Sequence, residues 1–334
     1  MKRRAIRALL AGLMLTCGWA TAQAGATSAF CERGPTLSAG EQDTLLRFAG
    51  VLRTELDASG EDTVLISRSG LDLSAFGLRY SHAGVALRDR QTGVWRVRQL
   101  YYACDEAAPR LYDQGLAGFV MGSERPQLGH LSIVRLPPAA AEALRAAALD
   151  TPAALQLLAS RYSANAHAWG LRYQNCNQWV LELMALAWGD LPRGDDLRAR
   201  AQQWLRQAGY DPEPVRVPSH GLMFASSFVP LLHLDDHPED DRYALRLRVS
   251  VPATLEAFAR FRWPESRHLE LCHNARQVVV REGWSPVDDA CDGAPSDRHQ
   301  PLSCEPWQGT GRMRRAPAPN PRSRYNGQAP RAPG

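Results

Sequence analysis

Lysine is almost absent from this sequence, and the positive charge it carries is unevenly placed. Lys2 is the only lysine among 334 residues. The formal net charge is +4, but four positive charges lie within the first seven residues and six arginines follow Trp307, so the rest of the chain has a net charge near −6. This part lacks the basic surface by which proteins bind nucleic-acid phosphates. We therefore expect no nucleic-acid partner.

Long apolar runs are also lacking after the N-terminus. A membrane-spanning helix needs roughly 20 apolar residues, and the longest candidate, residues 221–234, is interrupted by two serines and Pro230. Residues 1–24 differ, because a basic start is followed by a short apolar run and by small residues at Ala22 and Ala24. This pattern is typical of a signal peptide. We predict cleavage after Ala24, a periplasmic or secreted location, and no transmembrane span in the mature chain.

Hydrophobic periodicity predicts a mixed α+β protein. Ser38 and Glu41 form a capping box at the start of an amphipathic segment that ends near Ala58, which predicts a first helix. Alternating and short apolar segments predict strands, whereas longer segments with helical spacing predict further helices. The expected strands are residues 63–68, 80–88, 94–102, 131–136, 243–251, 268–272 and 276–282, and the further helices 138–149, 152–161, 177–188, 195–208 and about 252–261.

The composition divides the chain into four parts. After the signal peptide we expect a core over residues 25–210 and a C-terminal α/β extension over residues 211–307, packed on the core. Residues 308–334 are rich in arginine, proline and glycine and almost free of apolar side chains, which is typical of disorder.

Cys176 lies at the start of an unusually apolar helical segment. Asn175, with Gln178 three residues on, forms a variant capping box, so the helix is expected to begin at Cys176. The free N–H groups and the dipole of a helix start favour the thiolate, the form that attacks carbonyl carbons. A lone cysteine on an apolar helix is nevertheless usually core filler. A catalytic role therefore requires a partner base.

His82 is the best candidate for that base. Gly84 and Ala86 share its face of the expected strand, and we expect these small residues to let the Cys176 helix approach closely. In the next strand Gln99 lies on an otherwise apolar stripe, and a buried amide needs hydrogen-bond partners. If the two strands form a hairpin, Gln99 can accept the N–H of one imidazole nitrogen and leave the other for Cys176.

Several other residues compete for roles in this site. Asp105 or Asp113 could orient His82 instead of Gln99, and His167 is a rival base. Tyr173 and Asn175 are candidates for lining the pocket or positioning an oxyanion, for which the backbone N–H of Cys176 is the obvious donor. The His- and Asp-rich residues 233–241 lack regular ligand spacing, so we expect neither a metal nor a cofactor.

Six cysteines remain in the mature chain, enough for three disulfides in an oxidising compartment. A cysteine that starts a packed helix is awkward to bridge, since disulfide geometry is demanding. We therefore favour the pairs Cys31–Cys104 and Cys272–Cys291, with Cys176 free and Cys304 unpaired.

Two short motifs, Ser-His-Ala-Gly at residues 81–84 and Tyr-Gln-Asn-Cys at residues 173–176, resemble a known arrangement. They are similar to the circularly permuted branch of the NlpC-type papain-like cysteine hydrolases, which includes lecithin:retinol acyltransferase and in which the histidine precedes the cysteine. This resemblance implies an antiparallel sheet packed on a central cysteine-bearing helix. It also implies catalysis by Cys176 and His82, with Gln99 where a histidine or glutamate is often the third residue.

A closer resemblance covers Phe30 to about Cys291. It is carried by residues 30–42, 69–89, 97–106, 110–119, 161–179 and 235–241. These segments look like the bacterial family called domain of unknown function 2145, a resemblance that implies no established activity.

Two functions of different classes follow. The first is an exported thiol hydrolase or acyltransferase that attacks an amide or ester through Cys176, with a cell-wall peptide or an acyl compound as substrate. The alternative is a non-catalytic periplasmic binding or assembly protein that retains the papain-like core. The oligomeric state is left open.

Overall fold

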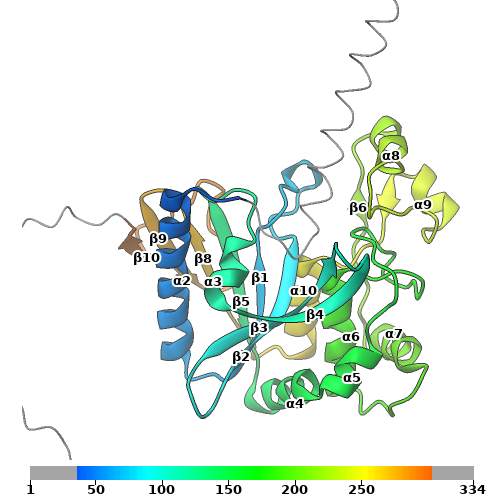
Figure 1. Cartoon of the computed structure of the whole chain (residues 1–334), viewed down its shortest axis with the longest axis horizontal. Helices are drawn as coiled ribbons and strands as arrows, with labels where there is room; N and C mark the ends of the chain where they lie inside the picture. Colours follow the sequence, from blue (N-terminus) through cyan, green and yellow to red (C-terminus); the bar gives the residue numbers. More distant parts are fainter. Residues whose placement is uncertain (1–35, 303–334) are drawn as a thin grey trace, which may run out of the picture. The chain divides into compact units, whose positions relative to one another are not determined.

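A large antiparallel sheet organises the part of the chain that the computed structural model describes, residues 36–302. The chain divides into two compact units, and every described residue belongs to the first, residues 1–303. Within residues 36–302 the sheet has eight strands in the order β10-β9-β8-β5-β1-β2-β3-β4 (Figure 1). The strands are β1 (Thr63–Arg68), β2 (His82–Arg88), β3 (Trp95–Ala103), β4 (Ala108–Gly115), β5 (Gly129–Arg135), β8 (Arg267–His273), β9 (Gln277–Glu282) and β10 (Arg298–Pro301).

The helices and a small second sheet complete the fold. The expectation of a mixed α+β fold is confirmed. The helices are α2 (Ala39–Ser59), α3 (Leu116–Met121), α4 (Pro138–Leu149), α5 (Thr151–Gln156), α6 (Cys176–Trp188), α7 (Leu197–Gln207), α8 (His220–Ser226), α9 (Glu239–Tyr243) and α10 (Pro252–Arg262). A short 3₁₀ turn, η1 (Ser74–Phe76), precedes β2, and β6 (Val215–Arg216) pairs with β7 (Arg246–Leu247).

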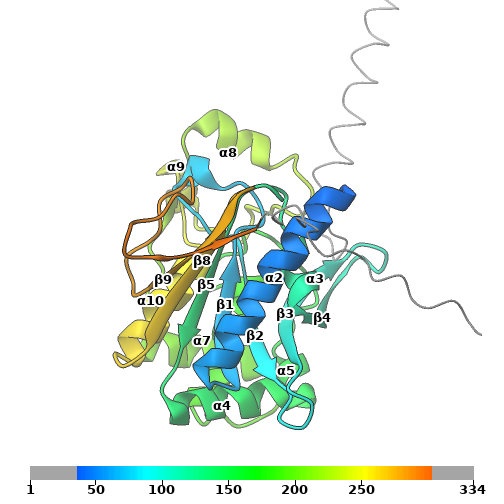
Figure 2. The same cartoon turned by 90° about the vertical axis from the view of Figure 1, so that its left-hand side faces the viewer.

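Helices cover both faces of the eight-stranded sheet. Helices α2 and α3 lie on one face, as the side view in Figure 2 shows for α2, and they share a core with the side chains of Val64, Ile66 and Ala86. Helices α4, α6, α7 and α10 share the opposite core with Ala83 and Val85. Successive residues of β2 thus point to opposite layers, as the period of two in a strand requires.

One packing expectation is wrong. Helix α6 does not lie on the Gly84 and Ala86 face of β2; it packs on the Ala83 and Val85 face. Gly84 is small for another reason, since a Cβ there would come within 2.6 Å of Val97 Cγ1 on the neighbouring strand β3. The small residues of this strand therefore serve strand-to-strand packing rather than contact with the helix.

Local patterns predicted most elements but not all. The first helix appears as α2, and its capping box between Ser38 and Glu41 is present. Strand β4 and helix α3 were not expected, because the edge strand β4 exposes much of its surface and carries no clear alternation. The expected strand over residues 243–251 is wrong except for β7, since Val249 and Val251 pack into a small separate cluster with Val217.

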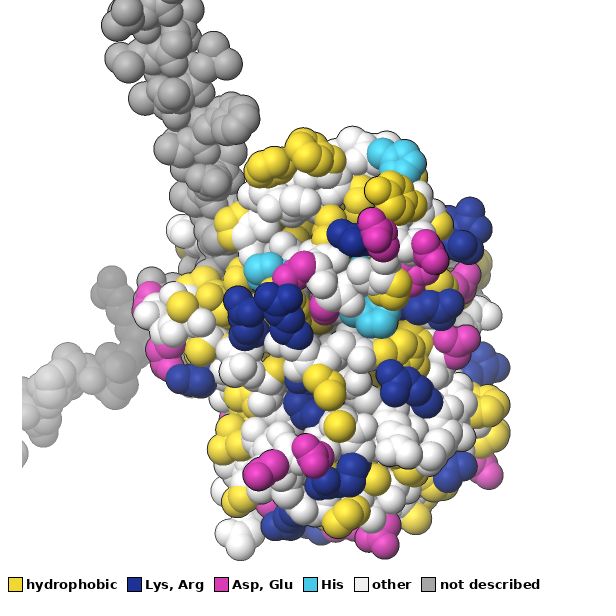
Figure 3. All heavy atoms as spheres, turned by 90° about the vertical axis from the view of Figure 1, so that its right-hand side faces the viewer, with side chains coloured by type: hydrophobic (Ala, Val, Ile, Leu, Met, Phe, Trp, Pro, Cys, Tyr) yellow, Lys and Arg dark blue, Asp and Glu magenta, His cyan; other side chains and the backbone are white. Residues whose placement is uncertain are grey.

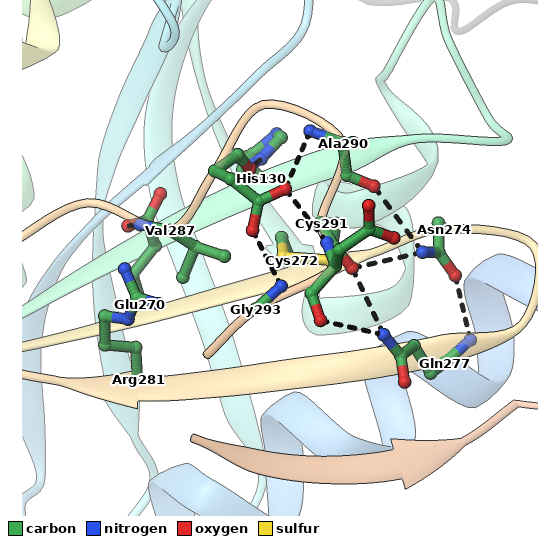
Figure 4. Close-up of a disulfide and its surroundings, with 12 residues drawn as sticks. His130, Glu270, Cys272, Asn274, Gln277, Arg281, Val287, Ala290, Cys291 and Gly293 are labelled. Carbon is green, nitrogen blue, oxygen red and sulfur yellow. Dashed lines mark hydrogen bonds between the residues drawn. A yellow bond between two sulfur atoms is a disulfide. The ribbon is translucent and has the colours of Figure 1, made fainter. Parts of the chain in front are cut away.

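The predicted disulfide between Cys272 and Cys291 is present, with both residues buried (Figure 4). It ties β8 to the loop that follows β9. Asn274 and Gln277 donate side-chain N–H groups to the Cys291 carbonyl oxygen over 3.1 and 3.3 Å. Cys104 is also disulfide-bonded; its predicted partner Cys31 lies outside the described residues.

No helix between residues 36 and 302 combines the length and hydrophobicity that crossing a bilayer requires. The predicted signal peptide, residues 1–24, the tail, residues 308–334, and Cys304 lie outside the described residues. The boundary expected at residue 210 stays a prediction, although β8, β9 and β10 of the C-terminal part belong to the same sheet as β1 and β2.

Candidate functional site

Helix α6 begins at Cys176, and Asn175 fixes this start. The Asn175 side-chain oxygen accepts the backbone N–H of Gln178 over 2.7 Å, as an N-cap residue does. Its amide nitrogen donates to the carbonyl oxygens of Ala164 and Ser250. All polar atoms of the Asn175 side chain are thus engaged in holding the helix start against two other segments.

The Cys176 thiol lies against the backbone on both sides of His82. Its sulfur is 4.0 Å from the Ser81 carbonyl oxygen, and the Ala83 backbone N–H also hydrogen-bonds to it. Among the described residues Cys176 is the free cysteine, and it is buried. Asn177 donates its side-chain amide to the same Ser81 oxygen over 3.3 Å. The N-terminus of α6 is therefore tied to the first residues of β2.

The expectation that the helix start favours a thiolate is not met in this resting state. Burial raises the pKa of the Cys176 thiol to about 11. The Ala83 N–H, the positive charge of Arg68 and the N–H groups of the helix start act in the opposite direction but are weaker. Desolvation of a charge outweighs the local dipoles when the group is enclosed. The resting cysteine is therefore a neutral thiol.

His82 and Gln99 lie on neighbouring antiparallel strands, as predicted. The His82 Nε2 atom is 2.7 Å from Gln99 Oε1. Gln99 Nε2 donates to Gln114 Oε1 over 2.7 Å, which directs the Gln99 oxygen toward the imidazole. His82 therefore carries its proton on Nε2. Its Nδ1 atom, which makes no hydrogen bond to any described residue, is the basic nitrogen.

The imidazole is neutral for a physical reason. Burial and, to a smaller extent, the positive charge of Arg68 lower the pKa of His82 to about 3, whereas the Gln99 hydrogen bond opposes the shift. The His82 ring stacks on Tyr101 with ring centroids 4.6 Å apart. The neutral imidazole also lies near Phe119 of α3, with ring centroids 6.1 Å apart, on the face of the sheet opposite α6.

Cys176 and His82 both line a cavity of about 330 Å³ at the end of β2. The hydrogen bonds of the described residues do not include one between the thiol and the imidazole, so the pair meets only through this cavity and the backbone of residues 81–83. The other walls are largely apolar and come from residues 71–78, 215–232 and 247–251. Figure 3 shows apolar side chains gathered at the top of one face, over α8, where Phe224 and Phe228 are exposed.

The other candidates lie outside this cavity. The Tyr173 ring stacks on His233 at 4.4 Å, and its hydroxyl donates to Asp235 over 3.4 Å. Asp113 pairs with Arg98 over 2.7 Å instead of orienting His82. The His167 ring packs beside another histidine at 5.3 Å, within the loops rather than at the sheet.

Asp105 lies in the turn between β3 and β4. No cluster of three or more histidine, cysteine, aspartate or glutamate side chains within residues 36–302 has an arrangement suited to a metal.

Arg68, Tyr101 and Gln114 were missed by sequence reasoning. Arg68 ends β1 and lies directly opposite His82 in the β1–β2 pairing. It is only 5 % exposed and donates to the Tyr101 hydroxyl over 2.6 Å. The available signal was an arginine at the end of a strand, Thr63–Arg68, whose other members are apolar or small and which is buried throughout.

The described residues define a class: a mixed α+β protein with a buried cysteine at a helix start and a histidine–glutamine pair on adjacent strands. Within that class, the chain belongs to the family of uncharacterized proteins conserved in bacteria named DUF2145, domain of unknown function 2145, whose family model matches residues 55–259. That range contains Cys176, His82 and Gln99. No curated protein and no solved structure matches the chain. The papain-like resemblance stays a prediction.

Proposed function

We propose that this protein is an exported cysteine hydrolase or acyltransferase that attacks an amide or ester through Cys176. His82 acts as the general base and Gln99 positions its ring. The observation that carries the proposal is the fixed tautomer of His82: Nε2 is held by Gln99, Nδ1 makes no hydrogen bond to a described residue, and His82 lines the same cavity as Cys176.

The chain order and layer order support a permuted papain-like core. The histidine strand β2 precedes the cysteine helix α6 in the chain, and α6 packs on the antiparallel sheet. The residue that orients the histidine comes from the next strand, β3. These features match the arrangement implied by the two short motifs at residues 81–84 and 173–176.

The chemistry follows from the neutral resting pair. When a carbonyl carbon approaches the sulfur, the thiol proton passes to His82 Nδ1 as the S–C bond forms. The backbone N–H of Cys176 donates to the developing oxyanion. The imidazolium then protonates the leaving amine or alcohol, and the thioester is released by water or by an acceptor nucleophile. Because the thiol pKa is high and the imidazole pKa is low, proton transfer accompanies attack rather than preceding it.

Export is supported by the cysteine chemistry of the described part. The buried Cys272–Cys291 disulfide and the disulfide-bonded Cys104 are typical of proteins that fold in an oxidising compartment. Together with the signal-like residues 1–24 they favour the periplasm or the exterior.

A non-catalytic binding protein is the second candidate, and two observations favour it. The thiol pKa is raised rather than lowered, and no hydrogen bond joins the thiol and the imidazole among the described residues. Both features are also expected of a cysteine that only fills the core.

Acyl-enzyme trapping separates the two candidates. The mature protein is incubated with activated acyl esters, acyl amides and cell-wall peptide fragments, and intact-mass and peptide-mapping spectra are recorded. We expect a mass increase equal to the acyl group on Cys176. Cys176→Ala should show none, while Ser132→Ala, which alters a buried hydroxyl that does not line the cavity, should behave as the native protein. If native protein and Cys176→Ala are equally unmodified by every substrate, the binding-protein candidate is the better account.

A further inference from the structure

Arg68 is a buried cation with no acidic partner among the described residues. It is 5 % exposed, and it lines the same cavity as Cys176 and His82. Its Nη1 atom donates to the Gly122 carbonyl oxygen over 2.6 Å and to the Ser69 carbonyl oxygen over 3.5 Å, and its Nη2 atom donates to the Tyr101 hydroxyl over 2.6 Å. Its Nε atom is buried without a partner. An enclosed charge that lacks a counter-ion is costly, so a protein that keeps one has room for an anion beside it.

The backbone is built closely around this guanidinium. A Cβ atom at Gly70 or at Gly122 would collide with the Arg68 side chain, and both glycines line the cavity. The guanidinium is therefore confined to one position by the chain on either side of it. Its three partners, two backbone carbonyl oxygens and one hydroxyl, are neutral acceptors, which orient the group without cancelling its charge.

The charged and titratable neighbours leave the inner end of the cavity positive. His82 is neutral because its pKa is lowered to about 3 by burial and by Arg68. Glu124 lies at the cavity and is exposed, and it forms no ion pair with Arg68. Partial burial raises the Glu124 pKa, with a small opposing contribution from Arg68. A ligand anion would therefore be the nearest counter-charge to the guanidinium.

The rest of the cavity is suited to hydrocarbon. Its apolar walls include Leu71, Phe76, Leu78, Met223 and Val249. A volume of about 330 Å³ lies at the lower end of the range for small-molecule sites. One cavity thus combines apolar walls, a thiol–imidazole pair and a single uncompensated cation.

We propose, building on the function proposed above, that the substrate is an amphipathic acyl compound with an anionic group close to the scissile bond. The apolar acyl chain lies along the hydrophobic walls, the carbonyl carbon lies at Cys176, and the anion lies at Arg68. Arg68 faces His82 across the β1–β2 pair, and His82 supplies the proton to the departing group. The anion therefore belongs to the leaving amine or alcohol rather than to the acyl chain.

The reaction balances without a further reagent. The Cys176 sulfur forms a bond to the acyl carbon and the C–N or C–O bond of the substrate breaks. The thiol proton passes through His82 Nδ1 to the leaving amine or alcohol, which carries the carboxylate or phosphate. Water then cleaves the thioester and releases the free acid and the thiol.

Binding to the uncleaving Cys176→Ala protein tests the recognition step by itself. Calorimetry compares decanoylglycine with its neutral amide, and decyl phosphate with decanol. We expect the charged member of at least one pair to bind at least about tenfold more tightly, the scale of one charge-assisted hydrogen bond. A preference in the first pair only indicates a carboxylate ligand, and in the second pair only a phosphate. Equal affinities within both pairs would overturn the proposal.

Variants assign the charge preference to Arg68. In the Cys176→Ala background, Arg68→Gln should abolish the preference, while Arg68→Lys should keep part of it. Arg145→Gln is the matched control, because Arg145 is also a buried arginine that donates to backbone carbonyl oxygens, at Asp62 and Arg88, but does not line the cavity. Unchanged preference in Arg68→Gln would overturn the proposal, and thermal melts report whether each variant folds. If Arg68→Gln does not fold, the control still tests the assignment. Loss of the preference for charged ligands in Arg145→Gln would show that the preference does not come from Arg68.

Two readouts keep this proposal separate from the proposed function. Acylation of Cys176 by neutral and charged esters alike, without a charge preference in binding, would sustain the hydrolase and reject the anion site. A charge preference that depends on Arg68, without acylation by any substrate, would sustain the anion site and reject the hydrolase.

Discussion

His82 and His268 lie on strands of the same sheet and are equally buried, each 6 % exposed. His268 Nδ1 is 2.6 Å from the Gly283 carbonyl oxygen and its Nε2 is 2.9 Å from the Ser132 hydroxyl. The His268 ring stacks on Trp284. Both of its nitrogens are engaged, whereas His82 has one nitrogen held by Gln99, the other makes no hydrogen bond to a described residue, and the residue lines a cavity.

Ser132 and His268 are joined by a hydrogen bond, which Cys176 and His82 lack, but Ser132 and His268 do not line the cavity. Ser132 lies in the middle of β5, paired with β1 and β8 on either side, and is 1 % exposed. Its hydroxyl is enclosed by His268 and by Glu256 of α10, both of which hydrogen-bond to it, so a substrate carbonyl cannot reach it unless these buried groups move. Cys176 and His82 instead lie at the ends of their elements, beside a cavity. A short hydrogen bond between a nucleophile and a base is therefore not enough to indicate a catalytic site. A substrate must also be able to reach the pair, which the cavity at the end of β2 allows for Cys176 and His82.

The largest expected effect contrasts the two nucleophiles. Cys176→Ala should abolish acyl transfer, since no other described residue carries a free thiol, while Ser132→Ala should leave it within about twofold, as for a residue that touches no substrate. Turnover of an activated acyl ester by each purified variant measures this. Residual native-like turnover in Cys176→Ala would place the chemistry elsewhere.

The next effect contrasts the two bases. His82→Ala should lower the acylation rate by about 10²- to 10⁴-fold, the usual contribution of a general base. Adding Cys176→Ala should cause no further loss, because the two groups act in one step. Single-turnover acylation rates give the comparison. An additive double mutant would contradict a shared step.

Alkylation reports the raised thiol pKa. With a pKa of about 11 in place of 9.0, native Cys176 at pH 7 should have about 10²-fold less thiolate than an unperturbed cysteine and should react correspondingly slowly. The rate should go on rising to about pH 11. Iodoacetamide labelling followed by mass spectrometry over pH 6 to 11 measures this, with Cys176→Ala as the blank. A plateau below pH 8 would show a thiolate stabilised by the site.

His82 is expected to matter more for acylation, but His268 is expected to matter more for stability. His268→Ala should lower the unfolding free energy by about 1–3 kcal/mol, because it leaves the Ser132 hydroxyl and the Gly283 oxygen without their partner. His82→Ala should cost less, since one of its nitrogens has no protein partner among the described residues. Urea unfolding of both variants decides the matter, and a larger loss for His82→Ala would make its role structural.

The pH dependence of stability supplies a further contrast. The folded pKa of His82, about 3, lies below its ordinary value of 6.5, so the unfolded chain binds the proton more readily. Its neutral form is fully favoured above pH 6.5, and stability falls as the pH drops from 6.5 toward 3. His82→Ala should therefore flatten the acid side of the stability curve relative to native protein. An unchanged slope in urea titrations between pH 6.5 and 4 would indicate that His82 is not desolvated.

The smallest effect concerns the positioning residue. Gln99→Ala should reduce acylation by about tenfold, because His82 loses the partner that fixes its tautomer. Gln99→Glu should restore orientation and raise the His82 pKa, which shifts the acid limb of the pH–rate profile upward. Loss of rate without any shift in that profile would mean that Gln99 serves only the packing of β3.

Local chemistry was enough to predict several parts of the site. The N-cap at Asn175, the start of α6 at Cys176 and the pairing of β2 with β3 depend on hydrogen bonds and side-chain periods between residues close in the chain. The His82–Gln99 contact followed from that hairpin. The capping box of α2 and the disulfide between Cys272 and Cys291 were likewise predicted correctly.

The tertiary structure decided which face of β2 meets the cysteine helix, and with it the reason for Gly84. It also placed Arg68 opposite His82, excluded Tyr173 from the cavity, and raised the thiol pKa that the helix start alone would lower. These features depend on strands and loops far apart in the chain, including residues 71–78, 215–232 and 247–251. A sequence determines the hydrogen bonds and periodicity of its local segments, whereas burial, desolvation and the walls of a cavity arise only when distant segments pack together.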